Sequence, residues 1–265
     1  MRLHVVIAVH EAERWHDACL ASLRAQTHED WRAVVVADPG RDGTADIARR
    51  HAADDARLEV LQAPRRRWQL ANRQAGWRHL DPPDDGVIVL LDGDDRWAHD
   101  RALATLAEAF TDVGTWLTYG RHATFQGRGT RAERRFARGL QRWGRPGRTR
   151  DYPRQALLER TVRSVGWRAG HPLAFRRFLA EAVREEDMRD RDGRPLRVAT
   201  DAALAYPMLE MAGPDHVRHL DEVLYVYNKA DQHRVAWTAP SRQRRTLRRI
   251  TRRTPYDAWT GDVAR

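Results

Sequence analysis

The chain has 265 residues and a formal net charge of +10, and its length fits one α/β domain with a large core or two small domains. The single cysteine, Cys19, excludes an internal disulfide, and its place on the apolar face of a predicted helix indicates an inert core thiol. No apolar stretch is as long as a membrane span, and the run 5–9 is too short for a signal-peptide core, so we expect a cytoplasmic protein.

Short β-branched runs alternate with amphipathic stretches through the first half of the chain. The predicted elements, in chain order, are a strand at 5–9, a helix at 11–25, a strand at 33–36, a helix ending at 50, a strand at 58–61, a helix at 68–80, a strand at 87–91, a helix from 102, a strand at 116–119, and helices at 173–183 and 200–211. Strands that alternate with helices at this spacing indicate βαβ units. The predicted fold class is α/β, with a Rossmann-like, mostly parallel sheet flanked by helices.

Two common nucleotide-binding classes are excluded by the turns of the sequence. The first predicted strand is followed by His10-Glu11-Ala12-Glu13, whereas a dinucleotide-binding dehydrogenase needs a glycine-rich turn there for the pyrophosphate. No Gly-x-x-x-x-Gly-Lys pattern occurs either, which argues against a P-loop enzyme.

The most informative motif is Leu90-Leu91-Asp92-Gly93-Asp94-Asp95, at the end of the apolar run 87–91. Acids at the carboxyl end of a parallel strand lie in the crevice where open α/β sheets bind ligands. Three neighbouring carboxylates repel one another, and a divalent cation relieves this repulsion. Their oxygens suit Mg²⁺ or Mn²⁺, which also hold substrate phosphates. The alternative is an acidic turn in which Asp94 or Asp95 caps the next helix.

Together with two further motifs, this chain resembles the family 2 glycosyltransferases, which have the GT-A fold. Gln26-Thr27 closes the first predicted helix, and residues 37–44 read Ala-Asp-Pro-Gly-Arg-Asp-Gly-Thr where the family usually has Asp-Asp-Gly-Ser-x-Asp-Gly-Thr. Asp92-Gly93-Asp94 matches the metal-binding Asp-x-Asp. The resemblance covers roughly residues 3–230, and residues 201–228 look like the C-terminal part of a subgroup that favours Leu-Asp-Gly-Asp-Asp.

The resemblance implies a nucleotide-sugar donor, most simply a UDP-sugar, and a divalent metal, Mn²⁺ or Mg²⁺. It places Asp38 against the nucleotide base and His10 where the family often has an aromatic residue that packs on the base, although an ordinary surface histidine is the alternative. Ala37 and Pro39 depart from the motif and leave the base identity open. The implied donor-binding residues are Ala8, His10, Asp38, Arg66, Arg67, Asn72, Asp92 and Gly93, and the implied metal ligands are Asp92, Asp94 and Asp95. Within the run Arg65–Arg67, one guanidinium is expected to contact phosphate and the others to be solvated.

The resemblance also implies that Asp201 is the general base, because Thr200-Asp201 occupies the place of the family's Glu-Asp pair. An ordinary helix cap is the alternative. Glu210 is the rival acid, but nine residues at about 100° each turn it to the opposite face of the helix. His171 is a candidate near the acceptor or the metal, and His219 and His233 are weaker metal candidates.

Two arginine-rich segments carry the positive charge. Residues 128–154 contain ten arginines against Glu133 and Asp151, and residues 234–253 contain eight arginines and no acid. We therefore divide the chain into a GT-A domain at 1–232 and a basic tail at 233–265. Within the domain we distinguish a nucleotide-sugar half at 1–120, an Arg/Gly-rich arm at 127–154 and an acceptor-side half at 155–232. The arm is either a lid that meets phosphate or a solvated insertion. The tail is either a basic helix against anionic lipid or nucleic acid, or simply solvated.

The predicted function is metal-dependent, inverting transfer of a sugar to an acceptor hydroxyl, on a saccharide, a lipid-linked sugar or another molecule. A single displacement with Asp201 as base would invert the anomeric centre. Two alternatives remain: a nucleotidyltransferase of the same fold, and a catalytically silent scaffold that binds a polyanion. A cytoplasmic protein that is peripheral at the membrane fits the basic segments.

Overall fold

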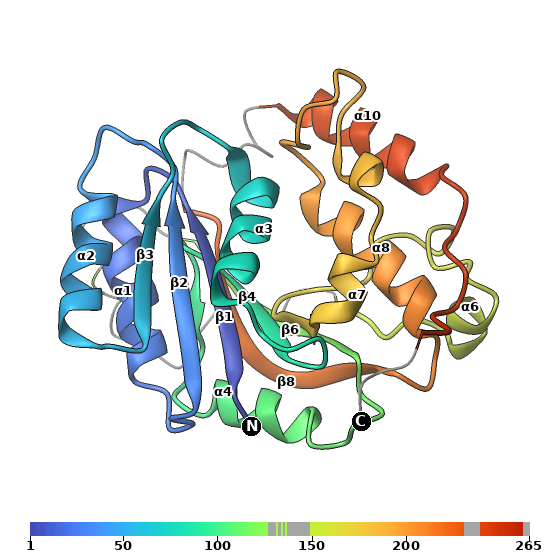
Figure 1. Cartoon of the computed structure of the whole chain (residues 1–265), viewed down its shortest axis with the longest axis horizontal. Coiled ribbons are helices and arrows are strands. Elements are labelled where there is room, and N and C mark those ends of the chain that lie inside the picture. The colour runs from blue at the N-terminus through green and yellow to red at the C-terminus, as the bar shows by residue number, and fades with distance from the viewer. Residues whose placement is uncertain (127–130, 132–133, 135, 137–148, 231–238, 262–265) are drawn as a thin grey trace.

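The computed structural model describes residues 1–126, 131, 134, 136, 149–230 and 239–261. The strands are β1 Leu3–Val9, β2 Trp31–Ala37, β3 Leu58–Gln62, β4 Val87–Asp92, β5 Arg96–Trp97, β6 Leu117–Phe125, β7 Leu173–Arg176 and β8 Val217–Asn228. The helices are α1 Glu13–Arg24, α2 Thr44–Asp54, α3 Trp68–Leu80, α4 Ala102–Ala109, α6 Arg154–Leu158, α7 Arg177–Glu181, α8 Thr200–Ala212 and α10 Pro240–Thr251, with a 3₁₀ turn, η1, at Glu185–Met188. In these residues the strands form one sheet in the order β3-β2-β1-β4-β7-β6-β8-β5 (Figure 1).

The first four strands of this order are parallel, as the sequence predicts. In their register Ala8 of β1 pairs with Val36 of β2 on one side and with Asp92 of β4 on the other. The carboxyl ends of β1, β2 and β4 therefore meet at one edge of the sheet, where ligands bind in open α/β folds.

Helices cover both faces of this parallel half (Figure 1). Val6, Val34 and Val36 face α3 and α8 in one apolar cluster, whereas Val5 and Ile7 belong to a second cluster with α1, α2 and α4. Because both faces are buried, the strands are continuous apolar runs rather than alternating ones. Cys19 is fully buried in the second cluster, which confirms the inert core thiol.

The helix predicted at 173–183 is wrong in its first half. Residues Leu173–Arg176 form strand β7, and only Arg177–Glu181 form a helix, α7. β7 pairs antiparallel with β4 on one side and with β6 on the other. These two long-range ladders satisfy the backbone on both sides of the segment, and they outweigh its local helical pattern.

Where the structure describes the basic tail, one face of α10 and the segment after it pack against the core, so the tail is not merely solvated, although its outward-facing arginines are exposed. Ile250 of α10 is fully buried, and both it and Tyr256 belong to the cluster that contains α8. Trp259 N–H donates to the Met211 carbonyl, which ties the segment after α10 to the end of α8. The division of the chain at residue 232 stays a prediction.

Most of the Arg/Gly-rich arm lies outside the described residues. Phe136 is described and fully buried, with its ring 5.3 Å from that of Trp15 and 5.0 Å from that of Phe125. Its carbonyl accepts a hydrogen bond from Arg96. This part of the arm is therefore anchored to α1 and β6. Across the described residues, no helix has the length and apolar character needed to cross a membrane.

Candidate functional site

A cleft of about 210 Å³ lies at the carboxyl edge of the parallel strands, between this edge and the start of α8. It is lined by most of the predicted site residues: Ala8, His10, Asp38, Arg66, Asn72, Asp92, Gly93, Asp94, His171 and Asp201. The cleft therefore brings the Asp-x-Asp motif and the predicted base together, although they are more than 100 residues apart in the chain.

Other predicted residues do not line this cleft. Arg65, Arg67, Asp95, Glu210 and His219 are not among its lining residues. His219 lies beside the Tyr119 ring, with a centroid distance of 5.2 Å. His233 lies outside the described residues.

Asp95 is turned into the core, which corrects its assignment as a metal ligand. Its side chain is fully buried and accepts hydrogen bonds from the Tyr225 hydroxyl at 2.9 Å and from the Asn228 amide at 2.7 Å. Burial and the nearby carboxylates raise the pKa of Tyr225 well above its ordinary value, so its hydroxyl stays protonated and donates. Asp95 thus ties the acidic turn to β8.

Glu210 also has a structural role, so its assignment as an acceptor-side residue is wrong. Its carboxylate forms a two-pronged ion pair with Arg163, at 2.6 and 2.7 Å, and both side chains are buried. Arg163 also donates a hydrogen bond from its third nitrogen to the Ile250 carbonyl of α10 at 2.7 Å. The geometry agrees with the helical spacing, which places Glu210 on the face of α8 opposite Asp201.

Arg73 is the main site residue that the sequence analysis missed. Its guanidinium is 1% exposed and donates to Asp92 Oδ1 at 2.7 Å and to Asp201 Oδ1 at 2.5 Å. Burial lowers the pKa of Arg73, but the charges of the two carboxylates raise it above its ordinary value, so the guanidinium stays charged. The sequence did contain a pattern that indicates this role. Arg73 lies between Leu70 and Trp77 on the buried face of α3, and a buried arginine needs acidic partners.

Asp38 fixes the start of α3 from the neighbouring strand end. Its two carboxylate oxygens accept hydrogen bonds from the amides of Arg67 at 2.8 Å and Trp68 at 2.9 Å. Trp68 has a φ of +71°, a strained conformation for a non-glycine residue, and it is one of the residues that line the cleft. The guanidinium carbons of Arg66 and Arg197 lie 3.9 and 4.7 Å from this ring.

Two histidines face the cleft in different surroundings. Burial and the neighbouring Arg66 guanidinium lower the pKa of His10, so its imidazole is neutral at pH 7. His171 stacks on the rings of Tyr225 and Tyr227, at 4.9 and 5.9 Å, which fixes the plane of its imidazole.

The acidic turn fits a divalent cation that is shared with a substrate. Asp92 and Asp94 line the cleft, and no group of three or more potential metal-ligating side chains occurs within the described part of the chain. Mg²⁺ is commonly held by one or two carboxylates plus substrate phosphates, so two acids suffice for such a site. Gly93 allows the turn, because a Cβ atom there would collide with the Val9 side chain.

The sequence comparisons point to one family. A model described as "Glycosyl transferase family 2" matches residues 4–182. The putative teichuronic acid biosynthesis glycosyltransferase TuaG of Bacillus subtilis (strain 168) is 25% identical over 97 residues, which make up 37% of this chain and 37% of TuaG.

Solved structures of similar fold cover nearly the whole chain. S. aureus TarS 1–349 in complex with UDP-GlcNAc matches with a TM-score of 0.64 at 17% identity, over 94% of this chain and 65% of that one. The mannosyltransferase PcManGT of Pyrobaculum calidifontis, in complex with GDP-Man and Mn²⁺, matches with a TM-score of 0.57 at 19% identity, over 94% of this chain and 62% of that one. Glucosyl-3-phosphoglycerate synthase of Mycobacterium tuberculosis, with Mn²⁺ and UDP, matches with a TM-score of 0.59 at 16% identity, over 94% of this chain and 79% of that one. The matched part of this chain spans less than two thirds of the length of TuaG, TarS 1–349 and PcManGT. The fold shared with the solved structures confirms the predicted α/β fold class.

Proposed function

This chain belongs to glycosyl transferase family 2, and from that premise we propose that it moves a sugar from a nucleoside diphosphate to an acceptor hydroxyl with inversion. The observation that carries the proposal is the meeting of Asp92, Asp94 and Asp201 in one cleft. A metal-binding turn alone would serve a nucleotidyltransferase or a silent scaffold equally well. A carboxylate on the opposite wall favours sugar transfer, because this reaction must remove a proton from the acceptor.

The donor side of the cleft is the edge formed by β1, β2 and α3. His10, Asp38 and Trp68 would surround the nucleotide base, and Arg66 and Arg197 would approach the diphosphate. The TarS and Mycobacterium synthase structures hold UDP-GlcNAc and UDP, and PcManGT holds GDP-Man. We favour a UDP-sugar for this chain.

Asp92 and Asp94 would hold Mn²⁺ or Mg²⁺ together with the diphosphate oxygens. A divalent cation at this position stabilises the charge that develops on the diphosphate leaving group. The structures of PcManGT and of the Mycobacterium synthase contain Mn²⁺, which supports this choice of metal. Arg73 and Gln69 both donate to Asp92 Oδ1, so they fix the orientation of this carboxylate.

Asp201 would remove the proton from the acceptor hydroxyl. Arg73 donates to Asp201 Oδ1, which leaves Oδ2 to accept the proton. The acceptor oxygen then attacks the anomeric carbon as the bond to the nucleoside diphosphate breaks. One displacement of this kind inverts the configuration.

Calorimetry of nucleotide binding tests the donor half of this proposal. UDP should bind far more tightly with Mn²⁺ than with a chelator, and more tightly than GDP or CDP. Asp94→Ala should remove the dependence on metal. Asp215→Ala, at an exposed acid outside the cleft, should preserve it. Equal affinity of the unmodified protein for UDP with and without metal would count decisively against the site.

A further inference from the structure

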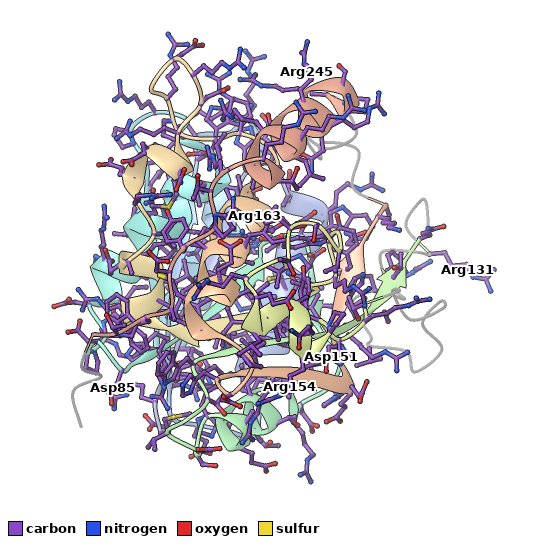
Figure 2. The ribbon with its side chains drawn as sticks, turned by 90° about the vertical axis from the view of Figure 1, so that its right-hand side faces the viewer. Asp85, Arg131, Asp151, Arg154, Arg163 and Arg245 are labelled. Carbon is purple, nitrogen blue, oxygen red and sulfur yellow. The ribbon has the colours of Figure 1, made fainter. Side chains whose placement is uncertain are left out.

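A second hollow of the surface lies along α10 and is strongly basic. This groove has a volume of about 740 Å³ and is lined by Asp190, Arg191, Arg242, Arg245, Thr246, Arg248, Arg249, Arg252 and Arg253. We call it the arginine groove. Figure 2 shows Arg245 at the outer edge of the molecule, whereas Arg163 lies nearer to its centre.

Asp190, which lines the groove, and Asp187, which pairs with one of its arginines, neutralise only part of the positive charge of the groove. Asp190 accepts from Arg249 at 2.9 Å and from Arg242 at 3.1 Å, and Asp187 lies 3.3 Å from Arg253. No described carboxylate lies within ion-pair distance of the remaining arginines of the groove, which are Arg191, Arg245, Arg248 and Arg252. An uncompensated set of guanidinium groups attracts anions, and each group can bind a phosphate or carboxylate through two hydrogen bonds.

The packing of α10 argues against insertion into a membrane. Thr246 and Ile250 are buried against the core, and Leu247 packs against the same cluster. The apolar face that a membrane-bound helix buries in lipid is therefore already covered by protein. The outward face instead carries the exposed side chains of Arg245, Arg248 and Arg252.

The spacing of these three arginines indicates a ligand with several charges. Arg245 and Arg248 lie in α10 and Arg252 is its C-cap, so at spacings i, i+3 and i+7 they share one face and span about 10 Å along the helix axis. A chain with repeated anionic groups can pair one group with each of the three arginines.

The groove begins where the cleft ends. Gln243 of α10 lines the cleft and accepts a hydrogen bond from the Ala199 amide at 2.9 Å, directly before α8 and Asp201. The preceding residue, Arg242, lines the groove. A chain lying in the groove can therefore extend past the first turn of α10 toward Asp201.

We propose that the arginine groove binds the acceptor, and that this acceptor is a polymer with repeated phosphate or carboxylate groups. This inference rests on the proposed function, because it assigns the groove to the acceptor of the same reaction. The groove holds the charged body of the chain by ion pairing, and the terminal hydroxyl reaches the cleft.

Binding of linear inorganic polyphosphate to the full chain tests the groove. The triple variant Arg245→Gln/Arg248→Gln/Arg252→Gln should weaken polyphosphate binding at least about tenfold and make its salt dependence shallower by about two units of slope. The matched control is Arg50→Gln/Arg78→Gln/Arg101→Gln, which removes the same charge from exposed arginines outside the groove and the arm. The control should bind polyphosphate nearly as the unmodified protein does, and both variants should bind UDP with Mn²⁺ normally.

The outcomes separate this inference from the proposed function. Equal polyphosphate affinity of the two triple variants would overturn the inference that the arginine groove binds a polyanionic chain. Tighter arginine-dependent binding to single-stranded RNA or to phosphatidylserine vesicles than to polyphosphate overturns the choice of an acceptor polymer. If UDP does not bind even with Mn²⁺ while polyphosphate binding still requires the three arginines, the proposed function fails, and the acceptor role of the groove fails with it.

Discussion

Asp92 and Asp201 are joined through one guanidinium, that of Arg73, although Asp92 ends strand β4 and Asp201 lies in the first turn of α8. The two contacts measure 2.7 and 2.5 Å. The side chains of Arg73 and Asp92 are 1% and 11% exposed, so water screens their ion pair weakly, whereas Asp201 is 36% exposed and its pair with Arg73 is screened more. Neither carboxylate can change its orientation or charge without an effect on the other.

Removal of the bridging charge should destabilise the protein. Arg73→Gln leaves Asp92 and Asp201 without their shared cation, and loss of one partner of a buried ion pair costs about 3–5 kcal/mol of unfolding free energy. Urea unfolding measures this loss, and Mn²⁺ should stabilise the variant more than the unmodified protein because it supplies the missing positive charge. Arg78→Gln, at an exposed arginine of the same helix, should cost less than about 1 kcal/mol. A loss of similar size in the two variants would show that the bridge contributes little.

The parallel half of the fold and the place of the cleft were predictable from local sequence. Runs such as Val87–Leu91 are apolar without alternation, which is typical of strands buried on both faces. Parallel register brings the ends of β1, β2 and β4 to one edge, so the acids of the turn were expected in a crevice there. Asp201 entered the prediction through a motif, and its closeness to Asp92 is a property of the tertiary fold.

The remaining features depend on contacts that no local pattern encodes. Leu173–Arg176 is a strand because β4 and β6 flank it, and these strands lie far from it in the chain. The three acids of the turn look equivalent in sequence, yet it is the carboxylate of Asp95 that accepts hydrogen bonds from Tyr225 and Asn228. The arginines of the tail were compatible with a solvated segment, because the local sequence of α10 does not show that the helix packs against α8 and pairs with Asp190.

Loss of the proposed base should reduce transfer without loss of donor binding. Asp201→Asn keeps an oxygen for the hydrogen bond from Arg73 but cannot accept a proton, and general-base catalysis contributes about 10²–10⁴-fold. Single-turnover transfer should fall within this range, while UDP affinity with Mn²⁺ should change little. Asp257→Asn, at an exposed acid after α10, is the matched control. Transfer at the unmodified rate in Asp201→Asn would exclude Asp201 as the base.

Glu210 should matter for stability rather than for chemistry. Glu210→Gln keeps the shape of the side chain but leaves the buried Arg163 without its countercharge, with an expected loss of about 3–5 kcal/mol in urea unfolding. Addition of Arg163→Met removes the unpaired charge and should restore part of this stability. Transfer and donor affinity should be unchanged under conditions where Glu210→Gln is folded, because Glu210 does not line the cleft. A stable but inactive Glu210→Gln would contradict this role.

Stability should decrease on mild acidification because of His16. This side chain is fully buried behind the acidic turn, with Nδ1 2.9 Å from the Gly93 carbonyl, and burial lowers its pKa to about 4 from the ordinary 6.5. In the unfolded chain His16 takes up a proton as the pH falls below about 6.5, whereas the folded protein resists protonation until about pH 4. Stability from this group is therefore complete above pH 6.5 and is lost progressively toward pH 4, by about 3 kcal/mol in total.

Urea unfolding across this pH range measures the slope of the unfolding free energy against pH. His16→Gln keeps an N–H donor for the Gly93 carbonyl and should make the slope shallower, whereas His28→Gln, at a partly exposed histidine, should leave it unchanged. An unchanged slope in His16→Gln would show that other groups control the acid sensitivity.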